Sequence, residues 1–151
     1  MRIGVISDTH GLLRSKAVDA LEGVDHILHA GDVGKLKILQ RLGEIAPVTA
    51  IRGNVDVHGE CAALPDKEII DIGGRYLYML HNLDALDLNP AVTGVAVVIS
   101  GHTHKPKIEE RKGVLYLNPG SAGPKRFSLP ISLGFLEIVD GKVTAELREL
   151  L

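Results

Sequence analysis

Short apolar runs alternate with amphipathic stretches over the first third of the chain. Three of these runs have the length and branched side chains of strands buried on both faces: residues 2–7, 25–30 and 48–51. Between them, residues 17–21 and 36–42 place apolar side chains at helical spacing, with Ser15 as the expected N-cap of the first helix. The order strand, loop, helix predicts parallel strands joined by right-handed crossovers.

The remainder of the chain follows a different pattern. Residues 67–72 and 75–80 flank Gly73-Gly74, which predicts a β-hairpin with a two-glycine turn. Residues 82–94 have room for only a short helical piece before a buried strand at 95–99. The antiparallel strands expected after it are residues 107–110, 113–117, 131–139 and 142–147. A parallel half and an antiparallel half suggest two sheets packed face to face, with helices outside.

Composition narrows the class of protein. The 151 residues suit one domain, which we expect to span 1–151, and with 45% hydrophobic but only 3% aromatic residues its core must be aliphatic. A net charge of −2 without a basic block gives no electrostatic support for coating a nucleic acid. Cys61 is the only cysteine, which excludes an internal disulfide and a cysteine metal cluster. Met1-Arg2 leads directly into a strand and no apolar run is long enough to cross a membrane, so we expect a cytoplasmic protein.

Polar residues gather where the predicted strands end. Seven of them could bind a metal: Asp8, His10, Asp32, Asn54, His81, His102 and His104. Because ligands collect outside the carboxyl ends of strands in α/β sheets, these loops should meet in space. Glycines before Asp32, Asn54 and His102 are expected to give the backbone freedom that crowded ligands need.

The donor set indicates the kind of metal site. Two carboxylates, one amide oxygen and four imidazoles are too many for one first-row ion and suit two ions that share a bridging carboxylate. The mixture of nitrogen and oxygen donors favours Mn, Fe, Co, Ni or Zn over Mg or Ca. We therefore expect two divalent transition-metal ions, with Mn as the first candidate.

In this order along the chain, the motifs resemble the calcineurin-like metallophosphoesterases. The residues that carry the resemblance are Asp8-x-His10, Gly31-Asp32, Gly53-Asn54-x-Asp56, the lone His81 and Gly101-His102-x-His104. The variant Gly53-Asn54-Val55-Asp56 and the segment Asn118-Pro119-Gly120-Ser121 are similar to the small single-domain prokaryotic phosphodiesterase branch. The resemblance implies a four-layer α/β/β/α sandwich of two mixed sheets, and a hydrolase that acts on phosphoric ester bonds.

The resemblance also implies roles for individual residues. One metal would be held by Asp8, His10 and His104, the other by Asn54, His81 and His102, with Asp32 as the bridge. In a phosphodiesterase of this kind a hydroxide bridging the ions attacks phosphorus in line. Asp32 and Asn54 are therefore the expected catalytic residues, and the Asn54 amide could donate to a phosphate oxygen. The expected substrate is a small phosphodiester or a nucleotide, and the sequence leaves homo-oligomer formation open.

The sequence departs from the family pattern at two positions. Asn82 follows His81 where the family usually has glycine, and Val55 follows Asn54 where many relatives have a histidine that can protonate the leaving group. Two other functions stay open on this fold. One is a non-enzymatic scaffold, as in a retromer subunit with a degraded metal site, and the other is a regulatory module that binds a nucleotide without turnover. Every ligand position holds a competent residue, which favours an enzyme.

Several further residues have two interpretations each. Arg52 either reaches a phosphate oxygen or lies on a solvated strand face. Asp56 is expected to fix its own loop by an Asx-type hydrogen bond, and His29 to be structural or to support a ligand. The charged residues between 105 and 111 are typical of a solvated hairpin.

Overall fold

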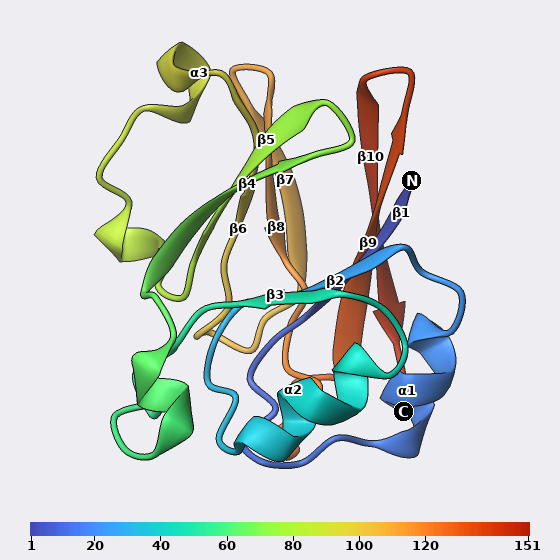
Figure 1. The fold of residues 1–151 in the computed structure, drawn as a ribbon. Coiled ribbons are helices and arrows are strands. Elements are labelled where there is room, and N and C mark those ends of the chain that lie inside the picture. Colours follow the sequence, from blue (N-terminus) through green and yellow to red (C-terminus); the bar gives the residue numbers. More distant parts are fainter.

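The computed structural model describes residues 1–151, which form two five-stranded sheets (Figure 1). The first has the order β10-β9-β1-β2-β3, with β1 (Arg2–Ile6), β2 (His26–His29), β3 (Val48–Ala50), β9 (Ser132–Val139) and β10 (Lys142–Glu149). The second has the order β4-β5-β6-β8-β7, with β4 (Lys67–Ile72), β5 (Arg75–Leu80), β6 (Val95–Ile99), β7 (Lys107–Arg111) and β8 (Val114–Asn118). The helical elements are α1 (Ser15–Leu21), α2 (Leu36–Gly43), α3 (Pro90–Thr93) and the 3-10 turns η1 (Glu60–Ala63) and η2 (Leu83–Ala85).

Both sheets are mixed, as the family resemblance implies. β1, β2 and β3 are parallel, but β9 pairs antiparallel with the free edge of β1, and β10 pairs with β9. The expected division into a parallel half and an antiparallel half is therefore wrong. The physical reason is that β1 is a buried central strand, and its second row of backbone donors and acceptors needs a partner. The strand of residues 113–117 is likewise not purely antiparallel, since β8 runs parallel to β6 on its other edge.

Aliphatic side chains fill two core layers. Between the sheets, Ile3 and Val5 of β1 pack in one cluster with Leu77 and Val97 of the second sheet. On the other face of the first sheet, Ile6 packs in a cluster with residues of α1 and α2. A side chain at Gly4 would lie 2.3 Å from Leu21 Cδ2, so this glycine lets α1 pack closely on the sheet.

The fourth layer is thin. The outer face of the second sheet carries a small cluster that includes Tyr78, Val98 and Val114, and the leucines of the segment between β5 and β6 cover it. Figure 1 shows this segment, with α3, on the side away from α1 and α2. Its helical pieces are only η2 and the four-residue α3, as the short interval between the strands predicts.

The first helix begins differently from the prediction. Ser15 is its first residue and Arg14 is the N-cap, which makes no side-chain capping hydrogen bond. Instead, Arg14 Nε donates to the Gly123 carbonyl at 3.1 Å. A contact from a distant loop therefore fixes the start of this helix in place of a local cap. No helix of the structure is long and apolar enough to cross a membrane.

Candidate metal centre

All seven expected ligands lie in loops that follow the carboxyl ends of five strands: β1, β2, β3, β5 and β6. Backbone hydrogen bonds join these loops directly. Asp8 N–H donates to Gly31 O at 3.0 Å, His10 N–H donates to Asp32 O at 2.9 Å, and Gly101 N–H donates to His81 O at 3.0 Å. The first two bonds join the loops after β1 and β2 of the first sheet, and the third joins the loops after β6 and β5 of the second sheet.

The four imidazoles form two pairs. The rings of His10 and His104 have centroids 5.5 Å apart, and those of His81 and His102 have centroids 5.3 Å apart. In the first pair, Asp8 Oδ1 lies 3.3 Å from His104 Nε2 and 3.7 Å from His10 Nε2. We call Asp8, His10 and His104 the first ligand group; its donor atoms all lie within 4.8 Å of one another.

Asp32 lies between the two pairs. Its Oδ2 is 3.2 Å from His81 Nε2 and 3.5 Å from His10 Nε2, while its Oδ1 accepts the Val55 N–H at 3.0 Å. Asp32 thus lies beside one imidazole of each pair. Asp8 also faces both pairs, since its Oδ1 is 3.7 Å from His81 Nε2.

Asn54 completes the second side of the cleft. Its Oδ1 lies 3.2 Å from His102 Nδ1, and both side chains are exposed. We call Asn54, His81 and His102 the second ligand group. The structure therefore brings all seven expected ligands to one cleft. The donor atoms that cluster besides the first ligand group are those of Asp8, Asp32 and His81, so the assignment of Asn54, His81 and His102 to a second metal stays a prediction.

Buried donors and acceptors without partners line the centre of the cleft. Asp8 Oδ1, His10 Nε2, His81 Nε2 and His104 Nδ1 are buried and make no hydrogen bond. Leaving a buried polar atom unpaired costs about 1–3 kcal/mol, so such atoms are rare in folded proteins. Three of the four face one another across the cleft, where divalent ions would satisfy them. The donor set fits transition-metal ions, as the sequence predicts.

The backbone of the ligand loops is strained. Asp8, His10, Asp32, His102 and His104 all have a positive φ, between 47° and 71°. Residues other than glycine pay about 1–3 kcal/mol for such conformations, which persist at functional sites because the surroundings enforce them. Five strained residues that are all expected ligands argue that the fold is organised around this cleft.

The glycines beside the ligands act differently from the prediction. Only Gly31 has a positive φ, of 103°, whereas Gly53 and Gly101 do not need glycine's freedom of φ. A side chain at Gly53 would lie 2.1 Å from Asp32 Oδ1, and one at Gly101 would lie 2.2 Å from Ser7 Oγ. At these two positions glycine is required because a neighbouring loop passes against the backbone.

The aspartates are oriented by neighbouring donors. Asp8 Oδ2 accepts from Ser7 Oγ at 2.7 Å and from the His102 N–H at 3.1 Å, which leaves Oδ1 directed at the imidazoles. Burial opposes ionisation of Asp32, but the His81 imidazole, 3.2 Å from its Oδ2, and the hydrogen bond from the Val55 N–H outweigh burial and lower the pKa of this carboxyl group to about 2. Asp32 is therefore an anion at neutral pH and a competent metal ligand.

The imidazoles differ in their protonation. The neighbouring carboxylate of Asp8, with help from the charge of Asp32, raises the pKa of His10. Burial opposes the charged form of His81, but the adjacent carboxylate of Asp32 raises its pKa overall. Burial lowers the pKa of His104. A metal cation bound in the cleft would interact with the carboxylates of Asp8 and Asp32 in place of the protonated rings of His10 and His81.

Asp56 ties two ligand loops together. Its Oδ2 accepts from Val33 N–H at 3.0 Å and from Gly53 N–H at 2.9 Å, and its Oδ1 accepts from Gly34 N–H at 2.9 Å. The predicted loop-fixing role is confirmed. The bonds, however, run back to Gly53 and across to the loop after β2, so they do not form an Asx turn.

His29 and Asn118 support the loops from behind. His29 is fully buried, with Nε2 3.0 Å from Thr9 Oγ1, and burial lowers its pKa to about 4. The predicted structural role of His29 is confirmed. The Asn118 amide donates to Gly101 O at 2.9 Å and to Thr103 Oγ1 at 3.1 Å, which holds the loop that carries His102 and His104.

Two arginines lie near the cleft. Arg52 lines a small pocket together with Asn54 and His81, but its Nη1 donates to Ala62 O at 3.2 Å, so its role toward phosphate stays a prediction. Sequence reasoning missed Arg126. The neighbouring Asp8 carboxylate has the larger effect on the pKa of His10, which it raises, and burial has the larger effect on that of His104, which it lowers; the positive charge of Arg126 acts to lower both pKa values. The signal was the basic pair Lys125-Arg126, shortly after the Asn118–Ser121 turn.

The sequence profile of the calcineurin-like phosphoesterase superfamily domain matches residues 1–141. The chain belongs to this family. Among its relatives, the probable metallophosphoesterase MJ0623 of Methanocaldococcus jannaschii is 42% identical over an alignment 134 positions long, which covers 80% of this chain and 68% of that protein.

Solved structures share the fold of this family member. An archaeal phosphodiesterase superposes with a TM-score of 0.81 at 26% identity, covering 98% of this chain and 100% of that one. Wild-type Vps29 of Entamoeba histolytica, solved as a complex with Zn²⁺, superposes with a TM-score of 0.76 at 26% identity, covering 100% of both chains. The α/β architecture of two mixed sheets with few helices is thus that of the family.

Proposed function

We propose that this protein is a metal-dependent phosphodiesterase that binds two divalent transition-metal ions. The observation that carries the proposal is the position of Asp32. Its carboxylate lies between the His10/His104 pair and the His81/His102 pair, beside buried donor atoms that have no partner. The family membership and the archaeal phosphodiesterase of the same fold support the reaction class.

When bound, two such ions would supply a hydroxide at neutral pH and stabilise the charge that develops on the phosphoryl oxygens. The protein's own residues position the reaction. Asp32 and the two ligand groups hold the cleft open at one geometry, because strained backbone and buried hydrogen bonds fix each loop. Because its Oδ1 faces His102, Asn54 keeps an exposed amide N–H that can donate to a phosphate oxygen. Arg126 adds a positive charge near the first ligand group and attracts an anionic ester.

A diester is the preferred substrate class for two reasons. Its single negative charge repels an attacking hydroxide less than the double charge of a monoester. In addition, Val55 occupies the loop position after Asn54, is 44% exposed and can donate no proton to an alkoxide. An ester whose leaving group departs without protonation is therefore the best substrate.

The test is turnover of bis(p-nitrophenyl) phosphate by protein as purified, after removal of metal with a chelator, and after addition of single metals. We expect no turnover without metal and the best recovery with Mn, Ni or Co. Asp32→Asn should be inactive with every metal. Asp71→Asn is the matched control, because Asp71 is an exposed carboxylate on β4 without a hydrogen bond or ion pair of its side chain. Full activity of a sample shown by elemental analysis to lack metal would disprove the proposal.

The likeness to Vps29 keeps a second candidate in view, a non-enzymatic scaffold. A nucleotide-binding module without turnover is the third. Neither predicts hydrolysis of any diester, so the same experiment distinguishes both from the enzyme when the bound metal is counted in parallel.

A further inference from the structure

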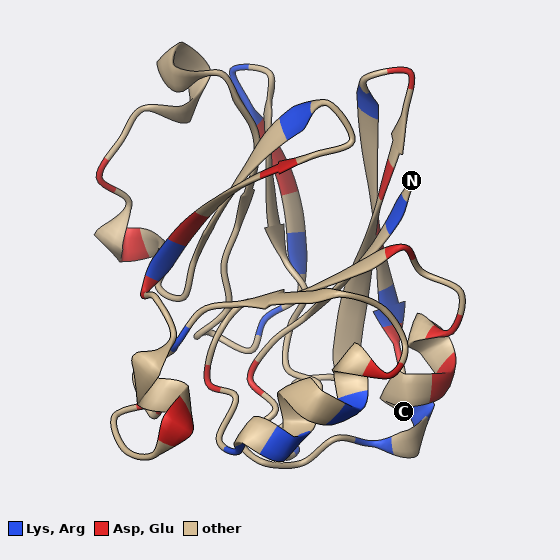
Figure 2. Ribbon diagram, viewed as in Figure 1, with Lys and Arg blue, Asp and Glu red and all other residues tan.

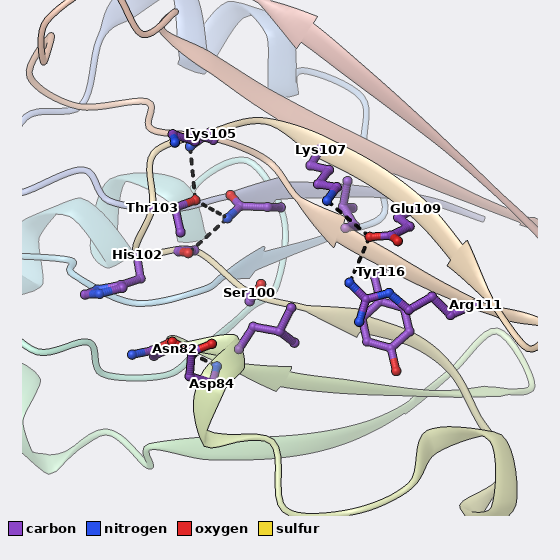
Figure 3. Close-up of a pocket in the computed structure, with 14 residues that line it drawn as sticks. Asn82, Asp84, Ser100, His102, Thr103, Lys105, Lys107, Glu109, Arg111 and Tyr116 are labelled. Carbon is purple, nitrogen blue, oxygen red and sulfur yellow. Dashed lines mark hydrogen bonds and ion pairs between the residues drawn. The ribbon is translucent and has the colours of Figure 1, made fainter.

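A pocket of about 300 Å³ opens beside the metal centre, on the side of the second ligand group (Figure 3). Ser100, Gly101 and His102 line the end nearest the metal centre, and Arg111 and Tyr116 line another part of its wall. His102 and Asn82 line both this pocket and the smaller one that contains Asn54 and His81. The pocket is therefore adjacent to the surroundings of the proposed ions.

One wall of the pocket is preassembled. Glu109 binds both Lys107, at 3.2 Å, and Arg111, at 2.9 Å, and the Arg111 guanidinium lies 4.8 Å from the centroid of the Tyr116 ring. Figure 3 shows these four side chains gathered together on β7 and β8. The hairpin is solvated, as expected, since Lys107 and Arg111 are exposed, and its side chains also form a polar wall of this pocket.

Free hydrogen-bonding groups lie at the end nearer the cleft. Asn82 Oδ1 accepts the Asp84 N–H at 3.0 Å, which fixes the side chain and leaves both amide hydrogens available. The Lys105 ammonium and the Asp84 carboxylate make no ion pair or side-chain hydrogen bond, and both line the pocket. These groups offer donors, an acceptor and a cation to a bound molecule.

From this arrangement we propose that the pocket binds one substituent of the phosphodiester, a nucleoside, and that the Asn82 amide positions it. The inference rests on the proposed function. A volume of about 300 Å³ is at the lower end for small-molecule sites, enough for one sugar and base. Most residues that line the pocket carry polar side chains, but most of its exposed surface is carbon, a combination that suits the hydroxyl groups of a sugar and the flat apolar face of a base. A residue without a side-chain amide at position 82 could make no such contact.

The experiment compares two esters that share a leaving group and a charge, thymidine 5′-(p-nitrophenyl) phosphate and methyl p-nitrophenyl phosphate, with Mn-loaded protein. We expect wild type to prefer the thymidine ester at least tenfold in kcat/KM. Asn82→Ser keeps an oxygen for the Asp84 N–H but removes the amide. Loss of one hydrogen bond should lower kcat/KM for the thymidine ester about 2–10-fold and leave the methyl ester unchanged. Asn89→Ser is the matched control, because Asn89 Oδ1 caps α3 through the Ala91 N–H at 3.2 Å and does not line the pocket.

The ratio of the two substrates protects the test against a poorly folded variant, since misfolding lowers both rates equally. Equal loss on both esters, no loss on either, or a wild type without preference for the thymidine ester would overturn the inference while leaving a phosphodiesterase in place. A wild type that hydrolyses neither ester would instead overturn the proposed function, and this inference with it.

Discussion

Asp56 gives the most direct test of how the cleft is held together. The carboxylate is 2% exposed and accepts three backbone N–H groups, from Val33, Gly34 and Gly53. Val33 is buried, Gly53 is half-buried and Gly34 is exposed, so water can replace the carboxylate only at Gly34. Substitution by alanine leaves two donors without a partner, at about 1–3 kcal/mol each, and removes a charge-assisted interaction. We expect Asp56→Ala to lower the free energy of unfolding by about 3–5 kcal/mol.

Asp56→Asn should lower the free energy of unfolding by less than Asp56→Ala does. Placed with its oxygen at the Oδ2 position, it keeps the bonds to Val33 and Gly53 and loses only the exposed one to Gly34. The expected loss for Asp56→Asn is therefore about 1–2 kcal/mol. Asp71→Ala, which removes an exposed carboxylate on β4, should change stability by less than about 0.5 kcal/mol.

The assay is urea unfolding of metal-free protein, followed by far-UV circular dichroism and extrapolated linearly with a shared slope. Metal retention after gel filtration is measured in parallel, because loosening Gly53 and the loop after β2 displaces Asn54 and Asp32 together. A loss below about 1 kcal/mol for Asp56→Ala, or an asparagine variant less stable than the alanine variant, would refute the reasoning.

Four further outcomes are expected. Asp32→Ala should lose both metals and His81→Ala only one, because the first ligand group remains; a count of two ions per chain in Asp32→Ala would show that it is no bridge. For phosphodiesters with graded leaving groups, the rate of hydrolysis should fall steeply as the leaving-group pKa rises. Val55→His should make this dependence weaker, since general acid catalysis is worth about 10²–10⁴-fold. A wild-type rate that does not depend on the leaving-group pKa would contradict this. The pKa of His29 is about 4 in the folded protein and 6.5 in the unfolded chain, so the unfolded chain binds a proton first as the pH falls. The free energy of unfolding should therefore decrease by up to about 3 kcal/mol between pH 6.5 and pH 4. Urea unfolding of His29→Asn should lack this decrease. Arg126→Met should reduce kcat/KM for a diester about 3–10-fold at low salt and by less at high salt, and an effect independent of salt would argue against electrostatic attraction.

Much of the local structure could be predicted because each element carries its own pattern. The hairpin of β4 and β5 has the bounds that Gly73-Gly74 predicts, and the buried strand at 95–99 is continuous and apolar. The seven expected ligands could be named because each follows a strand end, and the parallel arrangement brings strand ends to one edge. Residue types at strand ends therefore determined the chemistry of the site.

Contacts between distant segments were decided only by the tertiary structure. No local pattern shows that β9 pairs with β1, because a strand's sequence does not specify which edge it will join. The start of α1 depends on Gly123, and the three partners of Asp56 lie in two different loops. Gly53 and Gly101 are glycines because other loops pass against them, which φ preferences alone do not reveal. The pocket around Asn82 and Tyr116 likewise exists only because η2 folds beside β7 and β8, so its wall could not be distinguished from a solvated hairpin until the packing was known.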